Sequence, residues 1–380
     1  MSDVFINNTS HFLPNDSISN DEIEEYLGLL NGQKSKSKSL VLRNNKITNR
    51  YYALDKFGLA THSNAELTSK AVRKLFENNS IDISTVDLLS SGTSTPDQMI
   101  PSHAVMVHGE TPELQALEVV SSSGVCCAGM HAFKYAFMSV KIGDKKRAIS
   151  SGSERISKLL RSENYSEEIQ KLAELEKNPY LAFEKDFLRW MLSDGAGAFL
   201  LESKPNANSL SLRVDWIEGV SFAHIQEPCM YMGADKLKNG YLKSYMDYSL
   251  EEILNNSILS VKQDVKQLGE NIVPLGFVKL DQLLKEKGLT VNDFDYFLPH
   301  LSSYFFEDKI AEFLDLNGMN IPKEKWFTNL ATVGNVGSAS IYLMIDALFH
   351  SKQLKKGQKI LLVVPESARF SYVYSVLTVC

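Results

Sequence analysis

One segment limits more than any other what this chain can fold into: an apolar strand that turns into a helix around two adjacent cysteines. The apolar residues Leu117, Val119 and Val120, two of them β-branched, are typical of the end of a strand. Small residues occupy most of positions 121–124, and from Ala128 onward apolar side chains recur at helical spacing. Cys126 and Cys127 therefore lie where the strand ends and a buried helix begins.

This placement can activate a thiol. The first N–H groups of a helix have no partner within the helix, and its dipole is positive at this end, which lowers the pKa of a thiol and favours the thiolate. The small residues before the cysteines let a substrate carbonyl come close. The alternative is that both cysteines are small, unreactive core residues, which is common for this residue type.

Strands and helices alternate along the rest of the chain, which predicts an α/β fold with mainly buried sheets. A polar, proline-containing stretch at 204–208 divides the alternation into two halves, residues 1–204 and residues 205–380. In the second half we expect separate helices over residues 250–268 and residues 277–286. The charged stretch 158–177 has no continuous apolar stripe and predicts an inserted helical cap over a surface or a cleft.

The composition of the 380 residues excludes several classes of protein. A net charge of −6 gives no overall attraction to nucleic acid, and no window approaches the length of apolar chain that a membrane span needs. The first twenty residues lack a basic-then-apolar signal pattern, so we expect a cytoplasmic protein. None of the four cysteines has metal-site spacing, so we expect reduced thiols and no metal.

Three positions share one pattern: a strand ends, small or turn residues follow, and one reactive side chain is presented. They are Cys127, His300 and Asn335. A cysteine with a distant histidine and asparagine is a plausible nucleophile set, because the imidazole can take up or hold a proton and the amide donates hydrogen bonds. Each residue also has a structural interpretation, since a histidine at a strand end often only supports the fold and an asparagine beside glycine often only makes a turn.

The motifs around these residues resemble those of the β-ketoacyl-acyl-carrier-protein synthase III family of the thiolase superfamily. The similarity extends over nearly the whole chain, and the motifs occur in the family's order. Cys127-Ala128-Gly129 resembles the nucleophile segment, which selects Cys127 over Cys126. The other similar segments are residues 20–23, Gly-Thr-Ser-Thr-Pro-Asp at 92–97 with Pro101-Ser102, Ser-Asp-Gly-Ala-Gly-Ala at 193–198, His300, and Gly-Asn-Val-Gly-Ser-Ala-Ser at 334–340.

The resemblance implies the thiolase fold, five layers in the order αβαβα with two pseudo-equivalent halves. The first half would carry the nucleophile and the inserted cap, and the second half would carry His300 and Asn335. The resemblance also implies a homodimer and acyl transfer onto Cys127 from a phosphopantetheine thioester, with acyl carrier protein or CoA as the carrier and no bound cofactor.

Departures from the family's pattern concern the substrate. The family's His-Gln-Ala-Asn reads His300-Leu301-Ser302-Ser303 here, and its glycine-rich loop near the C-terminus is replaced by residues 365–370. The family's oxyanion hole joins an N–H of that loop to the cysteine N–H, so by position Ala368 and Cys127 would form it. Arg43, Arg369 and Ser338 are the further candidates for substrate binding.

These departures, together with residues 43–53, resemble the ring-forming ketosynthases of dialkylresorcinol and bacterial stilbene pathways, the DarB- and StlD-like enzymes. The resemblance implies an acyltransferase of secondary, polyketide-type metabolism that joins two β-ketoacyl thioesters and closes a cyclohexanedione ring. Ring closure without decarboxylation needs an additional base, and Glu154, which follows a strand beside small residues, is the candidate. The alternative for Glu154 is a structural ion pair with Arg155 or Arg369.

Two other functions compete with this interpretation. One is a decarboxylating β-ketoacyl synthase III that starts fatty-acid synthesis, in which malonyl-carrier is consumed and CO2 released. The other is a non-catalytic partner protein with the thiolase fold, against which the presence of Cys127, His300 and Asn335 argues.

Overall fold

The computed structural model describes residues 2–30, 32–35, 38–77, 81–164 and 188–380. Nine strands of the described chain form one mixed sheet in the order β13-β14-β15-β8-β1-β7-β6-β4-β5. Their bounds are β1 Phe5–Phe12, β4 Leu88–Thr93, β5 Glu118–Ser123, β6 Arg147–Glu154, β7 Gly195–Glu202, β8 Leu212–Ser221, β13 Tyr296–Pro299, β14 Lys359–Glu366 and β15 Ser371–Val379.

The two halves of the sheet repeat one topology. In the first half β1 pairs antiparallel with β7, β7 antiparallel with β6, β6 parallel with β4, and β4 parallel with β5. In the second half β8, β15, β14 and β13 pair in the same senses, and a parallel bridge from Phe297 to Trp326 occupies the place of β5. The halves join where Phe5 and Ile6 of β1 pair with β8.

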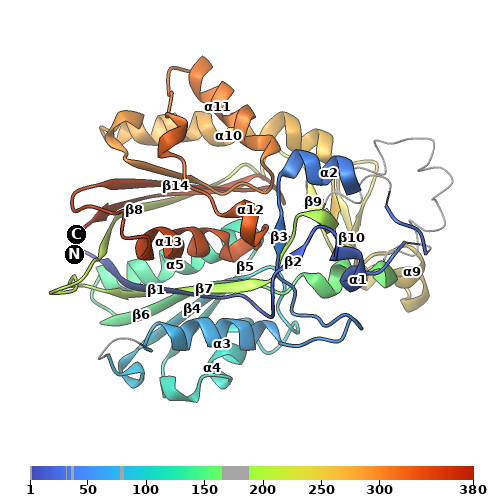
Figure 1. Cartoon of the computed structure of the whole chain (residues 1–380), viewed down its shortest axis with the longest axis horizontal. Coiled ribbons are helices and arrows are strands. Elements are labelled where there is room, and N and C mark those ends of the chain that lie inside the picture. The colour runs from blue at the N-terminus through green and yellow to red at the C-terminus, as the bar shows by residue number, and fades with distance from the viewer. Residues whose placement is uncertain (1, 31, 36–37, 78–80, 165–187) are drawn as a thin grey trace.

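The helices complete five layers (Figure 1). Helix α5 packs between β4 and β6 on one side and β14 and β15 on the other, and α13 lies beside it on β1 and β7. Helices α3 and α4 cover the outer face of the first half, and α10 and α11 cover the second. The αβαβα architecture that the sequence led us to expect is confirmed by this arrangement.

The helices have these bounds: α1 Ile23–Leu27, α2 Lys38–Asn45, α3 Asn64–Lys74, α4 His103–Gly109, α5 Cys126–Lys141, α9 Leu250–Asn255, α10 Val265–Glu286, α11 Phe305–Leu316, α12 Leu330–Val333 and α13 Ser340–His350. Short strands pair as β2 Ile18–Ser19 with β3 Asn49–Arg50, β10 Ala234–Lys236 with β11 Leu242–Ser244, and β12 Lys262–Gln263 with β9 Met230–Tyr231.

Local chemistry explains where the helices begin. In α3 the Ser63 side chain accepts the Glu66 N–H while the Glu66 side chain accepts the Ser63 N–H, a reciprocal cap. In α13 eight of the eleven residues are buried, because this helix lies between the sheet strands β1 and β7 and other parts of the core. A helix buried over most of its surface is usually apolar on more than one face, as this one is.

Two expected helices of the second half differ in the structure. Residues 250–268 divide into the short helix α9, the strand β12 and the start of α10. Helix α10 then continues through Pro274 to Glu286, so the separate helix expected over residues 277–286 is wrong. A proline inside a helix removes one backbone hydrogen bond, and here the burial of Ile272, Val273 and Phe277 outweighs that loss.

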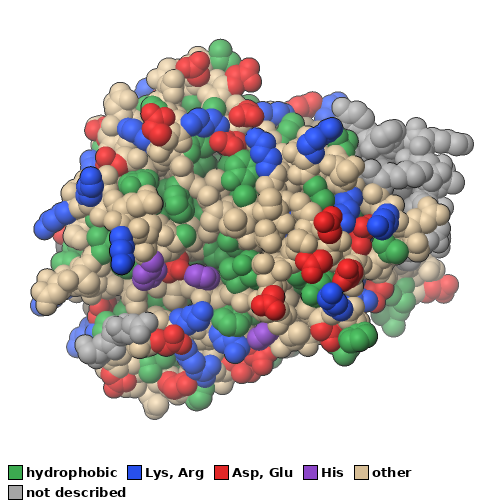
Figure 2. Space-filling view, in the orientation of Figure 1, with side chains coloured by type: hydrophobic (Ala, Val, Ile, Leu, Met, Phe, Trp, Pro, Cys, Tyr) green, Lys and Arg blue, Asp and Glu red, His purple; other side chains and the backbone are tan. Residues whose placement is uncertain are grey.

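The expected cap over residues 158–177 lies largely outside the described residues. The described start of it holds two single 3₁₀ turns, Ser157–Leu160 and Ser162–Asn164. No helix of the described chain is long and apolar enough to cross a membrane. On the face shown in Figure 2, acidic and basic side chains are interspersed.

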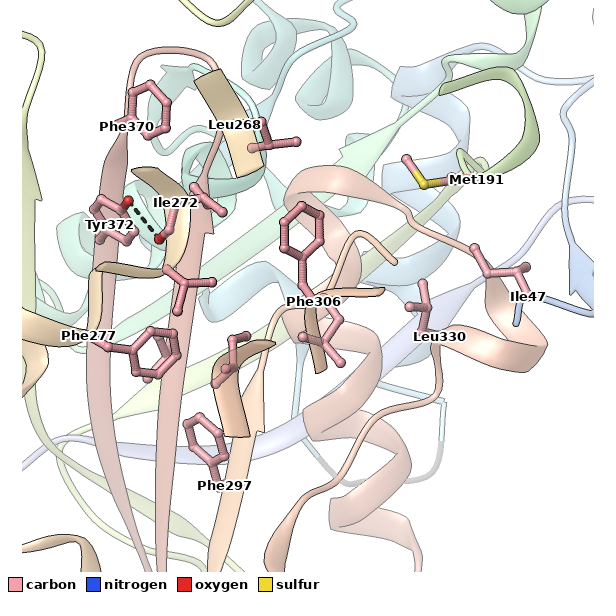
Figure 3. Packing of buried hydrophobic residues seen from close by; sticks show 14 of the residues in the cluster. Ile47, Met191, Leu268, Ile272, Phe277, Phe297, Phe306, Leu330, Phe370 and Tyr372 are labelled. Carbon is pink, nitrogen blue, oxygen red and sulfur yellow. Dashed lines mark hydrogen bonds between the residues drawn. The ribbon is translucent and has the colours of Figure 1, made fainter. Parts of the chain in front are cut away.

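The boundary expected between the halves, after residue 204, falls in the connection from β7, which ends at Glu202, to β8, which begins at Leu212. The core is divided among the layers rather than between the halves. One cluster fills the space around α5 and α13, a second lies under α3, and a third lies under α10 and α11. Figure 3 shows part of the third cluster, including Phe277, Phe297 and Phe306.

Candidate active site

Two cavities meet at the start of α5. The larger has a volume of about 270 Å³ and is lined by residues of both halves, among them Cys126, Glu154, Asn335 and Ser367. The smaller, about 40 Å³, is lined by His300, by Cys126 and Ser367 again, and by apolar side chains of α10 and α11. Cys126 and Ser367 therefore face both cavities, and the site lies where strand ends of the two halves come together.

Cys127 takes a different direction. Its side chain has no exposed surface, and its thiol donates to the Val364 carbonyl in β14 at 3.3 Å. Cys127 is not among the residues that line either cavity. The Cys-Ala-Gly motif had favoured Cys127 over Cys126, but the structure brings Cys126 to the cavities, because the first turn of α5 points consecutive side chains in different directions.

The expectation of an activated thiolate is corrected as well. Burial raises the pKa of both thiols well above the usual range, and the nearby Glu366 carboxylate adds to that increase. For Cys126 the carboxylate of Glu154 contributes in the same direction. The helix N-terminus is occupied by an anion already, so its field does not lower the thiol pKa.

That anion is Glu366, at the end of β14. Its Oε2 accepts the N–H of Val125 at 2.8 Å and the N–H of Cys127 at 3.0 Å. The Cys127 N–H is thus engaged and does not point to the expected oxyanion hole. The Cys126 N–H, in contrast, has no hydrogen-bond partner among the described residues.

The structure also favours Ser367 over the expected Ala368 as the N–H donor of this loop. The Ala368 carbonyl accepts the N–H groups of Cys229 and Met230, at 2.8 and 3.2 Å, and Ala368 lines neither cavity. Its neighbour Ser367 lines both cavities. The N–H groups of Ser367 and Ala368 both have no hydrogen-bond partner in the described part of the chain, and Ser367 is favoured as the donor because it lines the cavities.

His300 follows β13, and its own N–H bonds to the Val363 carbonyl at 2.8 Å, which fixes it beside β14. Burial lowers the pKa of the imidazole to about 4, so the ring is neutral at physiological pH. Its buried Nε2 has no partner in the structure. A buried polar atom of this kind usually has a hydrogen-bond partner, which makes Nε2 a natural contact for a substrate.

Asn335 lies in the turn between α12 and α13, held by backbone bonds from its N–H to Met191 and from Ser193 to its carbonyl, both 2.9 Å long. Its side-chain oxygen accepts the Gly337 N–H at 2.9 Å. Gly334, at φ 76°, makes the turn possible, since a side chain there would strain the backbone. The Asn335 amide nitrogen has no partner among the described residues and belongs to a side chain that lines the larger cavity.

Glu154 ends β6 and lines the larger cavity. Four hydrogen bonds reach its carboxylate: from Ser94 N at 3.2 Å, Ser94 Oγ at 2.6 Å, Thr95 Oγ1 at 2.8 Å and Ser338 N at 3.1 Å. Burial raises its pKa, and these donors oppose that increase. The expected alternative, an ion pair with an arginine, is absent here, since Arg155 bonds to Asp97 and Arg369 to the Gln226 carbonyl.

The three remaining candidates do not line the cavities. Ser338 is fully buried, and its hydroxyl donates to the carbonyls of Gly92 and Ser153, so its role is structural. Arg43 is exposed on α2, and Arg369 is exposed on the loop before β15. The described residues contain no group of three or more His, Cys, Asp or Glu that could hold a metal ion.

Comparison with known proteins bears on this geometry. Residues 284–365 match the family model described as 3-oxoacyl-[acyl-carrier-protein (ACP)] synthase III C terminal. β-Ketoacyl-[acyl-carrier-protein] synthase III of Clostridium perfringens is 23% identical over 355 residues, covering 93% of this chain and 92% of the relative. The enzyme of the same name from Hyphomonas neptunium is 25% identical over 363 residues, 94% and 93% of the two chains.

Solved structures share the whole fold. AbyA1, described as a tetronic acid condensing enzyme, has a TM-score of 0.76 at 20% identity, with 99% of each chain covered. OleA of Xanthomonas campestris, solved with bound lauric acid and lauroyl-CoA, has a TM-score of 0.74 at 16% identity, again over 99% of each chain. The chain is ketosynthase III-like. These relatives confirm an acyl-transferring enzyme of the kind that forms carbon–carbon bonds.

In this ketosynthase III-like enzyme the sequence patterns pointed to His300, Asn335 and Glu154, which line the two cavities, but they favoured Cys127 over Cys126 and did not single out Ser367 or Glu366. The Cys-Ala-Gly motif could not show which thiol faces the cavities, since only the start of α5 decides this. The loss of glycines at 365–370 signalled that this loop differs, but no pattern showed that Glu366 reaches across to α5.

Proposed function

We propose that the enzyme joins two β-ketoacyl thioesters through an acyl group bound to Cys126 and closes a cyclohexanedione ring. The observation that carries this proposal is the place of Cys126 between two cavities, one lined by Glu154 and Asn335 and the other by His300. The sequence resemblance to ring-forming ketosynthases supplies the reaction type. Dialkylresorcinol or stilbene precursors are the corresponding products.

Acyl transfer is the first step. The acyl group moves from the pantetheine sulfur to Cys126 Sγ, and the thiol proton leaves with the released pantetheine thiol. The N–H groups of Cys126 and Ser367, free in the described structure, stabilise the oxyanion of the tetrahedral intermediate. In this proposal Cys126 takes the place of Cys127 as the nucleophile, and the N–H groups of Cys126 and Ser367 take the place of those of Cys127 and Ala368, which the sequence resemblance had implied.

The second β-ketoacyl thioester is then held by its carbonyl through His300 Nε2 and the Asn335 amide. Both donors are neutral and pre-positioned, so they stabilise the enolate without reorganisation. Glu154 takes the proton from the carbon between the two carbonyls, which burial assists because it raises the carboxylate pKa. That carbon attacks the carbonyl of the acyl group on Cys126, the bond from this carbonyl to Cys126 Sγ breaks, and the released thiolate takes up a proton. A carbon beside one ketone then adds to another ketone carbonyl, whose oxygen takes up the proton, and this second carbon–carbon bond closes the ring.

Product analysis with two different β-ketoacyl thioesters tests the proposal. We expect a cyclic product that contains both acyl chains, formed with Cys126 acylated on the way. Glu154→Gln keeps the size of the side chain and should still be acylated, yet it should give little cyclic product. Normal cyclisation by Glu154→Gln would reject the role of this base, because the amide cannot accept the proton.

The carriers follow from the relatives' names. The synthase III relatives are named for acyl carrier protein and the OleA structure holds lauroyl-CoA, so either carrier of the phosphopantetheine arm is compatible with the site. We further propose a homodimer, as the resemblance implies. Comparison of acyl-CoA and acyl-carrier substrates at equal concentration, and light scattering of the purified protein, test these two points.

A second candidate function is favoured by the synthase III relatives, namely decarboxylative condensation with malonyl-carrier. In that reaction loss of CO2 generates the carbanion, and Glu154 is not required as a base. Release of labelled CO2 from malonyl-carrier by the enzyme would favour this second function over ring formation.

A further inference from the structure

Glu366 is the least expected feature of the site. Its side chain is only 8% exposed, and a single oxygen accepts two N–H groups of the first turn of α5, those of Val125 and Cys127. It does so from the end of β14, in the other half of the molecule. The carboxylate therefore connects the two halves of the site directly.

The two hydrogen bonds to Glu366 come from the residues directly before and after Cys126. Since the residues on both sides of it are fixed to one oxygen, the Cys126 peptide is held as well, and its own N–H is left without a partner among the described residues. Gly124 precedes this turn with φ at 153°, a backbone conformation that residues with a side chain rarely adopt.

Glu366 is also the residue directly before Ser367, whose N–H is the second proposed oxyanion donor. Ser367 lines both cavities and has an N–H with no partner in the described residues. The Glu366 side chain thus connects the backbone that carries the Cys126 N–H to the backbone that carries the Ser367 N–H. The sheet pairing of Glu366 with Ser371 fixes the hairpin from its far side.

We propose that Glu366 is a positioning residue that holds the N–H groups of Cys126 and Ser367 together as one oxyanion hole. The inference rests on the proposed acyl transfer to Cys126. Two donors aimed at one oxygen need a rigid backbone, because oxyanion stabilisation depends on donors that are already in place. Glu366 supplies that rigidity between β14 and the first turn of α5, which no backbone–backbone hydrogen bond joins in the described residues.

The charge of Glu366 has a separate consequence. The groups that face Cys126 are the carboxylates of Glu366 and Glu154, the neutral imidazole of His300, and the neighbouring Cys127 thiol. Both carboxylates disfavour a thiolate at Cys126. Removal of the Glu366 charge should therefore ease ionisation of this thiol while it weakens the hold on the oxyanion hole, so two readouts should move in opposite directions.

Glu366→Gln separates these effects, since it removes the charge and keeps an oxygen that can accept the two N–H groups. Alkylation of Cys126 by iodoacetamide, followed by site-resolved peptide mass spectrometry from about pH 6 to about pH 10, measures the thiol. Acylation by a β-ketoacyl N-acetylcysteamine thioester measures the oxyanion hole. We expect the alkylation profile to move down by about one pH unit, and acylation to be slower than in the native enzyme.

Glu366→Ala removes the acceptor too, and we expect acylation to fall by about 10²–10³, the usual effect of losing an oxyanion donor. Glu218→Gln, at a half-exposed site on β8, is the matched control and should leave both readouts unchanged. Thermal unfolding of each variant confirms that it is folded. A Glu366→Gln variant with native alkylation profile and native acylation rate would overturn the proposal.

The two proposals fail in different ways. If the native enzyme accepts no β-ketoacyl thioester but Glu366→Gln still moves the alkylation profile, the proposed reaction is wrong and the contact with α5 stands. If the native enzyme is acylated and both Glu366 variants behave like it, the positioning role is wrong and the reaction stands.

Discussion

The two cavities that meet at Cys126 are formed by different elements of the fold. The larger is lined by residues at strand ends and in turns, with the polar side chains of Glu154 on β6 and Asn335 before α13 beside apolar side chains such as Ile156 and Met230. The smaller is lined mainly by apolar side chains of α10 and α11, and His300 is its only titratable neighbour apart from Cys126 among the described residues that line it. Figure 3 shows three of these side chains, Phe306 of α11 and, to its left in the view, Ile272 and Phe277 of α10.

The difference separates two tasks. Proton transfer needs groups that can accept or donate, and these gather where strand ends bring loops of both halves together. An apolar environment excludes water and strengthens each electrostatic contact within it, and it is built from helix faces. In the proposed reaction the larger cavity supplies the base Glu154 and the Asn335 amide, while the apolar surroundings of the smaller cavity keep the His300 imidazole neutral, so that it can contact the enolate as an uncharged group.

The largest expected effect on acylation comes from replacing Cys126, the cysteine that lines both cavities. Cys126→Ala should abolish the acyl-enzyme completely, because the only thiol that lines the cavities in the described structure is then gone. Cys127→Ala should retain acylation, since the Cys127 thiol points to the Val364 carbonyl. Intact-protein mass spectrometry with a β-ketoacyl thioester measures both; acylation that survives in Cys126→Ala and disappears in Cys127→Ala would restore the choice made from the motif.

The next largest effect, on the rate of condensation, compares one residue of each cavity. His300→Ala in the smaller cavity and Asn335→Ala in the larger should each lower the rate of condensation by about 10²–10³, equivalent to about 2.7–4 kcal/mol of barrier, with acylation of Cys126 retained. Single-turnover kinetics separate the two steps. Asn317→Ala, at an exposed turn after α11, is the control. A variant that loses acylation and condensation equally would show that its residue serves the first step.

The dryness of the smaller cavity can be tested by pH. Its burial lowers the pKa of His300 to about 4, below the usual value of 6.5, so between these values the unfolded chain binds more protons than the folded one. Stability therefore falls as the pH decreases through this window, on the order of 3 kcal/mol for the one group.

Urea unfolding at several pH values measures this slope. His103, which burial also gives a pKa of about 4, contributes in the same direction from the first half of the molecule. His300→Asn and His103→Asn should each make the slope shallower by one proton. If only His103→Asn does so, the imidazole of His300 is solvated in the folded state and the smaller cavity is wet.

How far the sequence could foresee this arrangement depends on the range of the interactions. The strand-to-helix turn at Cys126 and the small-residue turn at Asn335 are local patterns, and both turns were predicted at their places, although helix α12 and not a strand precedes Asn335. The separation of Cys126 from Cys127 was not predicted, because it depends on the rotation of a single helical turn relative to β14. The length of α10 was missed because tertiary packing carries the helix through Pro274.

Contacts between the halves were beyond any local pattern. Glu366 reaches Val125 across 241 positions of the chain, and Glu154 reaches Ser338 across 184. In both cases the carboxylate follows a strand whose neighbours are set by sheet order. Sequence periodicity predicts that a strand exists and which side chains it buries, but it carries no information on which distant turn its last residue will meet.

The smallest expected effect sharpens the assignment of the smaller cavity. Ile310→Val on α11 removes one methyl group from its wall and should lower the free energy of unfolding by about 0.5–1.5 kcal/mol. Ile217→Val, buried in the cluster around α5 and α13, should cost the same and serves as the control for stability. If the smaller cavity accommodates part of an acyl chain, only Ile310→Val should shift the preference among β-ketoacyl thioesters of graded length towards the longer ones. Equal preferences in both variants and the native enzyme would mean that the chain never enters this cavity, and that its apolar wall serves His300 alone.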